Sequence, residues 1–295
     1  MVKCACQQKG GSPVKRKTLW KLCLTSALAA GTAGWLWWGN SAVMVHTVTV
    51  TDGNLPREFE GFRVAQVSDL HNTEFGAGNE TLLSLLEKAR PDIIVITGDL
   101  IDSRRTDVDV ALEFARGAVE VAPVYYVPGN HESRIPADFL KLERGLEELG
   151  VRVLRGEREL ITREGAAIAL IGVDDPTFSG EDSSQWEELL RGELERLREA
   201  GRYCVLLIHR PELAETYARA GMNLVFSGHA HGGQVRLPFI GGVIAPNQGF
   251  FPQYDGGLYT LGDTRMVVSR GLGNSIIPLR VNNRPEIILA ELHQS

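Results

Sequence analysis

The sequence has few cysteines, and their positions do not suit a disulfide framework. Cys4, Cys6 and Cys23 lie near the amino terminus, and Cys204 is the one cysteine in the rest of the chain. Small disulfide-rich proteins need several cysteines at regular spacing, so that class is excluded. A zinc site built from Cys4 and Cys6 is disfavoured, because structural zinc sites use four ligands.

Acidic residues are absent before Asp52, although six lysines and arginines occur in that stretch. When these six are set aside from the 31 basic residues, 25 basic and 37 acidic residues remain, a net charge of about −12. Non-specific binding of nucleic acid depends on contacts from Lys and Arg to phosphates. Bulk nucleic acid is therefore excluded as a partner, whereas a small phosphorylated substrate held by metal ions is compatible with this charge.

An uncharged stretch, residues 22–38, follows the basic residues and ends with Trp35, Trp37 and Trp38. A membrane-spanning helix needs about 20 apolar residues, with a lower limit of about 17, and flanking Lys and Arg mark the cytoplasmic side. The stretch predicts a transmembrane anchor with the amino terminus in the cytoplasm and the catalytic domain outside it. A cleaved signal peptide and a helix buried in the core are the alternatives.

The rest of the chain shows no internal repeat and no low-complexity linker. We therefore predict two parts: a basic amino terminus with the membrane segment (residues 1–45) and one catalytic domain (residues 46–295). Short apolar runs rich in β-branched residues predict buried strands at residues 63–68, 92–97, 124–128, 167–172, 204–208, 223–227, 266–269 and 286–291. Helical patterns alternate with them at residues 79–90, 107–121, 136–149, 183–200 and 211–220. This alternation is typical of an α/β fold.

Five of the predicted strands end in Asp, Asn or His residues. The motifs are Asp69-Leu70-His71, Gly98-Asp99, Gly129-Asn130-His131-Glu132, His209 and Gly228-His229-Ala230-His231. In layered α/β folds, ligands bind outside the carboxyl ends of the strands, so five such ends predict one shared site. A single histidine after a strand is more often structural, but five of the seven histidines fall in these motifs.

The donor types predict a site for two divalent metal ions. Residues two apart at a strand end leave the same face, so Asp69 and His71 can grip one ion, and the second histidine pair repeats this geometry. Asp99 is placed to bridge two cations. Carboxylate, amide and imidazole donors without thiolate suit manganese, iron or zinc, and suit calcium poorly; manganese is favoured. The predicted ligands are Asp69, His71, Asp99, Asn130, His209, His229 and His231.

Two such ions predict a reaction at phosphorus. Cations about 3.5–4 Å apart stabilise both the attacking and the leaving oxygens of an in-line displacement, and they lower the pKa of bound water. The expected reaction is hydrolysis of a phosphoric ester by a metal-bound hydroxide. His131 is assigned as general acid to the leaving oxygen, or as a donor to the phosphoryl charge. Asp102 is predicted to orient His131, with a solvated loop carboxylate as the alternative.

The long Gly- and Pro-rich segment 232–257 and three arginines are candidates for substrate recognition. Loops of that length are usually functional or mobile. Its aromatic residues either contact a lipid or sugar or pin the loop to the body: Phe239, Phe250, Phe251 and Tyr254. Arg236, Arg270 and Arg280 either bind a second phosphate through their planar donor groups or form ion pairs within the protein.

In this order, the motifs resemble the calcineurin-like metallophosphoesterase superfamily over residues 60–292. The segments Gly228–Pro238 and Ser269–Asn274 resemble its membrane-anchored bacterial phosphodiesterase branch. The resemblance implies a four-layer α-β-β-α sandwich. It also implies that one ion is held by Asp69, His71 and His231, the other by Asn130, His209 and His229, with Asp99 bridging and His131 catalytic.

We therefore expect a dinuclear-metal-dependent hydrolase of phosphodiester or diphosphate bonds, acting at a membrane surface. Its expected substrate is a phosphorylated small molecule or a lipid-linked diphosphate. A metal-dependent protein phosphatase is the second hypothesis, although the acidic body and the lack of a docking module disfavour it. A membrane-tethered binding protein without catalysis is the third, and the presence of His131 disfavours it.

Overall fold

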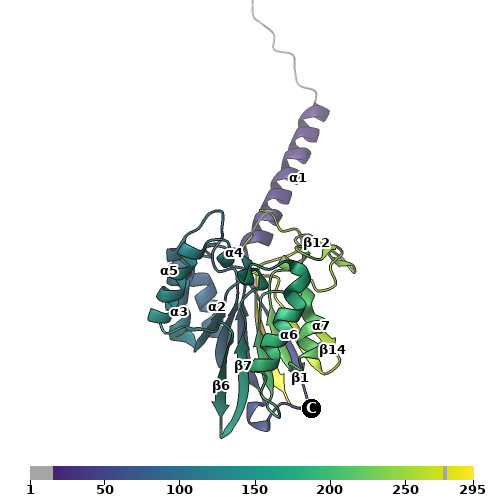
Figure 1. Ribbon diagram of the computed structural model, residues 1–295. Helices are drawn as coiled ribbons and strands as arrows, with labels where there is room; N and C mark the ends of the chain where they lie inside the picture. The colour runs from purple at the N-terminus through teal and green to yellow at the C-terminus, as the bar shows by residue number, and fades with distance from the viewer. Residues whose placement is uncertain (1–15, 275–277) are drawn as a thin grey trace, which may run out of the picture. The chain divides into compact units, whose positions relative to one another are not determined.

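Two six-stranded sheets form the centre of the unit Gly39–Ser295, as the computed structural model shows over residues 16–274 and 278–295 (Figure 1). The predicted strands are all present. The first sheet has the order β1 (Met44–Thr51), β16 (Glu286–His293), β2 (Phe62–Val67), β3 (Ile93–Thr97), β4 (Val124–Val127), β5 (Arg152–Val153). The second has the order β14 (Gly257–Leu261), β15 (Thr264–Val268), β9 (Leu224–Ser227), β8 (Cys204–Leu207), β7 (Ala166–Gly172), β6 (Glu157–Arg163).

The central strands are parallel and buried on both faces, which explains their continuous apolar sequences. All residues of β3, β4, β8 and β9 are buried. In the first sheet β2, β3 and β4 run parallel, and in the second β7, β8 and β9 do. Their carboxyl ends therefore lie at one edge of each sheet, which is where the predicted functional residues follow in the sequence.

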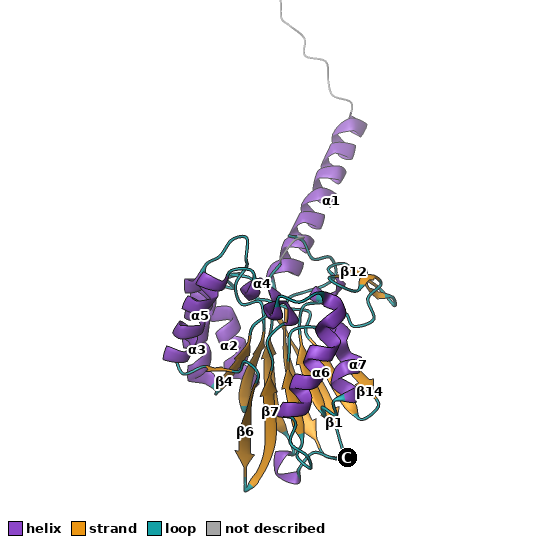
Figure 2. Cartoon of the chain, in the orientation of Figure 1, coloured by secondary structure: helices purple, strands orange, loops and turns teal. Residues whose placement is uncertain are grey.

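Helices cover the outer face of each sheet, giving the four layers visible in Figure 2. On the first sheet lie α2 (Glu80–Ala89), α3 (Val108–Val121) and α5 (Pro136–Glu148); on the second lie α6 (Trp186–Leu197) and α7 (Ala214–Arg219). Leu86 packs with Ile94 in the first helix–sheet core, and Leu194 packs with Leu206 in the second. A third core, containing Val95 and Phe226, joins the two sheets. The two-sheet α/β part of the predicted fold is confirmed.

Strand β1 lies across the predicted boundary at residue 45 and was missed by the sequence analysis. Val48 and Val50 are buried, whereas Thr47 and Thr49, which alternate with them, are exposed. This alternation is typical of a strand with one face on the core. The strand pairs in parallel with β16 at the edge of the first sheet.

The predicted transmembrane anchor is wrong. Residues Arg16–Ser41 do form one helix, α1, but no helix within residues 16–274 and 278–295 is long and apolar enough to cross a membrane. The predicted segment has no charge, but an uncharged segment need not be strongly apolar. Its hydroxyl residues Thr25, Ser26 and Thr32 lower its mean hydropathy. The predicted localisation, with a cytoplasmic amino terminus and an extracytoplasmic catalytic domain, depended on this anchor and is corrected with it.

The long segment 232–257 contains two short hairpins. β10 (Arg236–Leu237) pairs with β11 (Gly241–Gly242), and β12 (Ile244–Ala245) pairs with β13 (Gly249–Phe250). Phe239, Phe250 and Phe251 are exposed. Tyr254 is buried and packs edge-on against Tyr259 with ring centroids 5.1 Å apart. Tyr254 therefore pins the segment to the body, and the three phenylalanines do not.

The start of β16 carries a fully buried carboxylate, Glu286. It accepts hydrogen bonds from Nε and the backbone N–H of Arg270 at 2.9 and 3.0 Å, and lies 3.2 Å from Nδ1 of His46. Burial alone would raise the pKa of Glu286, but the His46 and Arg270 contacts outweigh it and lower that pKa to about 2. The ion pair joins β16 to the loop that follows β15.

We predict that Glu286→Gln lowers the free energy of unfolding by about 3 kcal/mol at pH 7, because one partner of a buried ion pair is then left uncompensated. A carboxylate with a lowered pKa in the folded state stabilises that state above its unfolded pKa. The difference between wild type and variant should therefore shrink as the pH falls from the ordinary value of 4.5 to about 2.

Urea unfolding at pH 7 and pH 3 checks this prediction. The matched control is Glu291→Gln on the same strand, because Glu291 is partly exposed and pairs with Arg63 at 3.0 Å. An exposed pair contributes at most about 1 kcal/mol. Equal losses in the two variants would contradict the assigned role of Glu286.

Candidate metal centre

The predicted ligands lie in turns that directly follow the strands, and five of the seven have a left-handed backbone. The φ angles are 53° at Asp69, 47° at His71, 52° at Asp99, 64° at His229 and 47° at His231. Such angles are uncommon outside glycine, though Asp and His adopt them more readily than most residues. Strained backbone of this kind gathers at functional sites, where the surrounding structure holds it in place.

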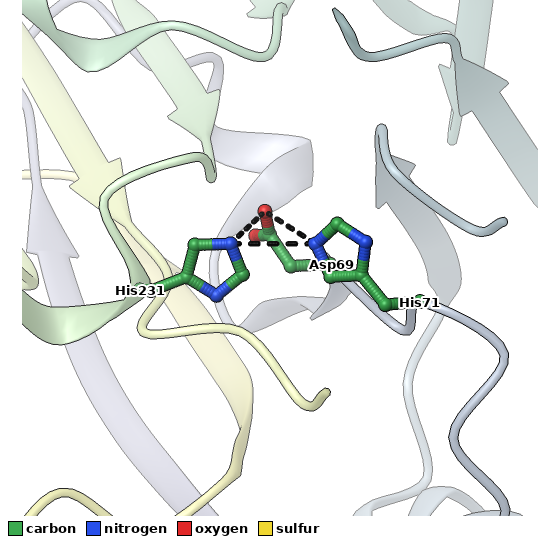
Figure 3. Close-up of side chains that lie close together, drawn as sticks. All are labelled: Asp69, His71 and His231. Atoms are coloured by element: carbon green, nitrogen blue, oxygen red, sulfur yellow. Dashed lines mark hydrogen bonds and ion pairs between the residues drawn. The ribbon is translucent and has the colours of Figure 1, made fainter. Parts of the chain in front are cut away.

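The first group consists of Asp69, His71 and His231, all buried (Figure 3). Nε2 of His231 lies 3.5 Å from Oδ1 of Asp69 and 3.3 Å from Nε2 of His71. Nε2 of His71 lies 4.0 Å from the same carboxylate oxygen. Figure 3 shows the three ligand atoms pointing toward one another, although His231 comes from the loop after β9 and the others from the loop after β2. This is the arrangement of a set of metal ligands.

The second group consists of Asp99, His209 and His229, also buried. Oδ2 of Asp99 lies 3.2 Å from Nε2 of His209, which in turn lies 3.2 Å from Nδ1 of His229. The same Asp99 oxygen lies 3.6 Å from Nε2 of His71 in the first group. Asp99 therefore stands between the two groups, as a bridging carboxylate must.

Asn130 lies beside the second group, at the start of the short helix α4 (Asn130–Ser133). It lines the same cavity as Asp99 and His229. Its Oδ1 is buried and has no hydrogen-bond partner among the described residues. A buried acceptor without a partner is costly, and a cation at this position would satisfy it. The residues present therefore fit a dinuclear metal site.

The hydrogen bond of His209 orients its ring for this role. Nδ1 donates to the carbonyl oxygen of Thr97 at 2.7 Å. The proton of the neutral ring is therefore on Nδ1, and Nε2 offers its lone pair toward Asp99. Histidines that bind metals commonly donate their other ring N–H to a carbonyl or carboxylate in this way.

Burial keeps most of the imidazoles neutral and thus able to bind metal. It lowers the pKa of His71 to about 3 and holds the pKa values of His229 and His231 well below their ordinary range. His209 is the exception: burial lowers its pKa, but the adjacent carboxylates, Asp99 foremost, outweigh burial and raise it to about 10. A divalent cation would compete with that extra proton for Nε2 of His209.

His131 lies at the cavity, and its Nδ1 has a nearer partner than the predicted Asp102. Nδ1 of His131 accepts a hydrogen bond from the backbone N–H of Ser103 at 3.0 Å, whereas Oδ2 of Asp102 is 4.0 Å away. Asp102 instead accepts from the backbone of Arg104 at 2.7 Å and lies 3.8 Å from Nδ1 of His71. Ser103 therefore makes the nearer contact to Nδ1. Because a backbone N–H can only donate, the neutral ring of His131 then carries its proton on Nε2.

Glu132 was quoted in the sequence only as the last residue of its motif, without a role. It is fully buried. Its carboxylate accepts from the backbone N–H groups of Gly129 at 2.8 Å, Asp99 at 3.0 Å and Ile101 at 3.2 Å. It therefore ties the loop after β3 to the loop after β4. Its position directly after Asn130 and His131 was the sequence feature that could have indicated a role at the site.

The three candidate arginines all have partners within the protein. Arg236 contacts Asp255 at 3.1 Å, and Arg270 pairs with Glu286. Arg280 is fully buried and donates from Nη1 to the carbonyl oxygen of Arg270 at 2.7 Å. These contacts favour the structural alternative over a phosphate-binding role.

A cavity of about 340 Å³ opens onto both groups. Its polar wall includes Asp99, Asn130, His131, His229 and His231, and Arg134 lies at its rim. Its remaining wall is Ile244, Ala245, Pro246 and Asn247, from the hairpin β12–β13, with Gln234. A larger cleft of about 670 Å³ lies elsewhere, at the amino ends of β8 and β9, and contains none of these residues.

The fold and the two groups define a metallophosphoesterase. The sequence profile of the family described as calcineurin-like phosphoesterase matches residues 62–233, and the chain belongs to this family. Membership supports phosphoric ester hydrolysis at a dinuclear metal centre.

The chain is similar to several bacterial proteins of this kind. It is 31% identical over 251 residues to the uncharacterized metallophosphoesterase YkuE of Bacillus subtilis, covering 83% of each protein. It is 28% identical over 245 residues to the phosphodiesterase YaeI of Escherichia coli, covering 78% of this chain and 82% of YaeI. A crystal structure of a Thermus thermophilus protein aligns with a TM-score of 0.47 at 15% identity, over 72% of this chain and 90% of that one.

We predict that Glu132→Gln lowers the free energy of unfolding by about 1–3 kcal/mol, because the amide places a donor against backbone donors that need an acceptor. Urea unfolding in the presence of a chelator measures this loss without a contribution from bound metal. Glu147→Gln, an exposed substitution on α5, is the control and should leave stability unchanged. A Glu132 variant as stable as this control would contradict the role of Glu132 in tying the two loops together.

Proposed function

We propose that the protein hydrolyses phosphodiester or diphosphate bonds with two divalent metal ions, in a catalytic domain spanning residues 46–295. One ion would be held by Asp69, His71 and His231, and the other by Asn130, His209 and His229, with Asp99 between them. The observation that carries the proposal is the position of Asp99, whose Oδ2 lies 3.6 Å from His71 Nε2 and 3.2 Å from His209 Nε2. A single carboxylate oxygen within reach of both groups is what a bridged pair of ions requires.

Two bound cations would neutralise charge on the reacting phosphoryl group and make water a better nucleophile near neutral pH. The donor set of carboxylate, amide and imidazole favours manganese, iron or zinc, and we propose manganese. The protein's own part is to keep His71, His229 and His231 neutral through burial and to hold the imidazole lone pairs toward the carboxylates.

His131 is the proposed general acid. With Ser103 N–H bonded to its Nδ1, the neutral ring carries its proton on Nε2, which is then the atom able to donate. His131 also lines the cavity. It can give this proton to the oxygen that leaves when the P–O bond breaks. General acid catalysis of this kind typically contributes about 10²–10⁴-fold to the rate.

The cavity wall favours a substrate with an apolar substituent. Ile244, Ala245 and Pro246 line the cavity together with the polar groups. Arg134 is exposed at the rim and offers a cation beside the site. A diester or diphosphate places a second substituent next to the reacting phosphorus, which such a wall can hold, and a lipid-linked diphosphate has this chemistry.

We predict that the manganese-loaded protein hydrolyses bis(p-nitrophenyl) phosphate faster than p-nitrophenyl phosphate. His131→Gln should lower kcat by about 10²–10⁴-fold while metal content is kept, because it removes only the proton donor. Asp99→Asn should lower both the activity and the metal content measured by elemental analysis, because it removes the shared ligand.

Asp109→Asn, an exposed substitution on α3, is the control and should behave as wild type. The proposal fails if the metal-loaded protein shows no turnover of either substrate, or if Asp99→Asn retains both its ions and its activity. Preference for the monoester would replace the diesterase assignment with a monoesterase one.

A further inference from the structure

The hairpin β12–β13 contributes more than a wall to the cavity. Ile244 pairs with Phe250, and Ala245 pairs with Gly249, so Pro246, Asn247 and Gln248 form the turn. Asn247 has a φ of 58°, a left-handed angle that asparagine accepts more readily than most residues. Its side chain reaches a histidine of the metal centre.

The two ring nitrogens of His229 face different groups. Nδ1 lies 3.2 Å from Nε2 of His209, inside the second group. Nε2 lies 3.1 Å from Oδ1 of Asn247. An amide oxygen can only accept a hydrogen bond, so this contact requires the proton of the neutral ring on Nε2. Nδ1 then keeps its lone pair, and it points to where an ion would bind.

Arg210 opposes this arrangement. Its Nη1 lies 3.5 Å from the same Nε2 of His229, and a guanidinium can only donate. Arg210 is buried and held by Asp175 at 2.7 Å and Glu212 at 3.1 Å, so it stays beside the ring. Arg210 therefore favours a proton on Nδ1 of His229, which would leave no lone pair there for metal. Asn247, at the shorter distance of 3.1 Å, favours the proton on Nε2 instead.

The hairpin is held so that Asn247 stays in reach. Gln248 Nε2 donates to the carbonyl oxygen of Tyr254 at 2.9 Å, and the N–H of Tyr254 donates back to Gln248 Oε1 at 2.9 Å. The backbone N–H of Phe251 donates to the carbonyl oxygen of Val243 at 2.8 Å. Tyr254 is itself buried. The turn therefore has a fixed attachment to the buried Tyr254.

We propose that Asn247 is a positioning residue that selects the metal-binding tautomer of His229. The hairpin that lines the cavity then also supports the second group of ligands. This inference rests on the proposed function, because that function supplies the metal ions. The tautomer of His229 can nevertheless be measured in the metal-free protein. Because Asn247 acts through His229, the first group of ligands should be independent of it.

Two variants separate the side chain from the backbone. Asn247→Gly removes the amide and tolerates the positive φ, whereas Asn247→Asp keeps an acceptor oxygen at the same place. Asn282→Gly is the matched control, because Asn282 has a φ of 52° and is exposed, and its amide donates to the carbonyl oxygen of Arg236 at 3.3 Å.

The first measurement is a calorimetric titration of the chelator-treated protein with Mn²⁺. Loss of an outer partner of a metal-binding histidine typically weakens binding about 10–100-fold. Asn247→Gly should weaken one of two binding steps by about 10-fold or more and leave the other unchanged. Asn247→Asp and Asn282→Gly should match wild type.

The second measurement is long-range ¹H–¹⁵N NMR of the metal-free protein, which reports which ring nitrogen of His229 carries the proton. Wild type should show the Nε2–H tautomer, and Asn247→Gly should shift the population toward Nδ1–H. The inference is overturned if the tautomer is unchanged in Asn247→Gly, or if that variant binds both ions as tightly as wild type. A wild type that binds no ions but shows the shift would sink the proposed function and leave this inference standing.

Discussion

The candidate centre depends on Asp99, a buried carboxylate at which the two sheets meet. Its Oδ2 faces His71 from the first sheet and His209 from the second, and its Oδ1 accepts the backbone N–H of His131 at 2.8 Å. A buried carboxylate needs donors or cations around it, so the loops gather close to it. Gly129 permits this approach, because a Cβ there would collide with Oδ1 of Asp99.

Several buried polar side chains around the centre hold its loops in place. Glu132 binds three backbone N–H groups of neighbouring loops, and Arg280 binds backbone carbonyl oxygens of the loop after β15. Arg210 is held between Asp175 and Glu212. In the proposed function, substrate recognition would therefore rest mainly on the metal ions and the cavity wall. This division would allow an acidic protein to act on an anionic substrate.

Predictions from the sequence were most accurate where a pattern has a single physical cause. Continuous apolar runs marked the buried strands, and the polar residues that follow them, such as Asp69 and His209, do converge. Predictions were least accurate where a pattern has two causes, because the uncharged stretch in α1 was taken as apolar. Asp102, the predicted partner of His131, lies 4.0 Å from its Nδ1, and Ser103 donates to the same atom at 3.0 Å. Strand β1 was missed because the strand predictions relied on continuous apolar runs, whereas Val48 and Val50 of this edge strand alternate with threonines.

The sequence by itself determined the kinds of side chain available to the centre and the strand ends at which they occur, because strand periodicity and ligand chemistry are local properties. Only the tertiary structure decided which groups face one another. Ser103 contacts His131 through its backbone N–H, and Glu132 accepts the backbone N–H of Asp99 from the neighbouring loop. Asn247 reaches His229 from a hairpin that follows later in the chain. These contacts join segments far apart in the chain, and a hydrogen bond depends on distance and direction in space, which no spacing along the sequence records.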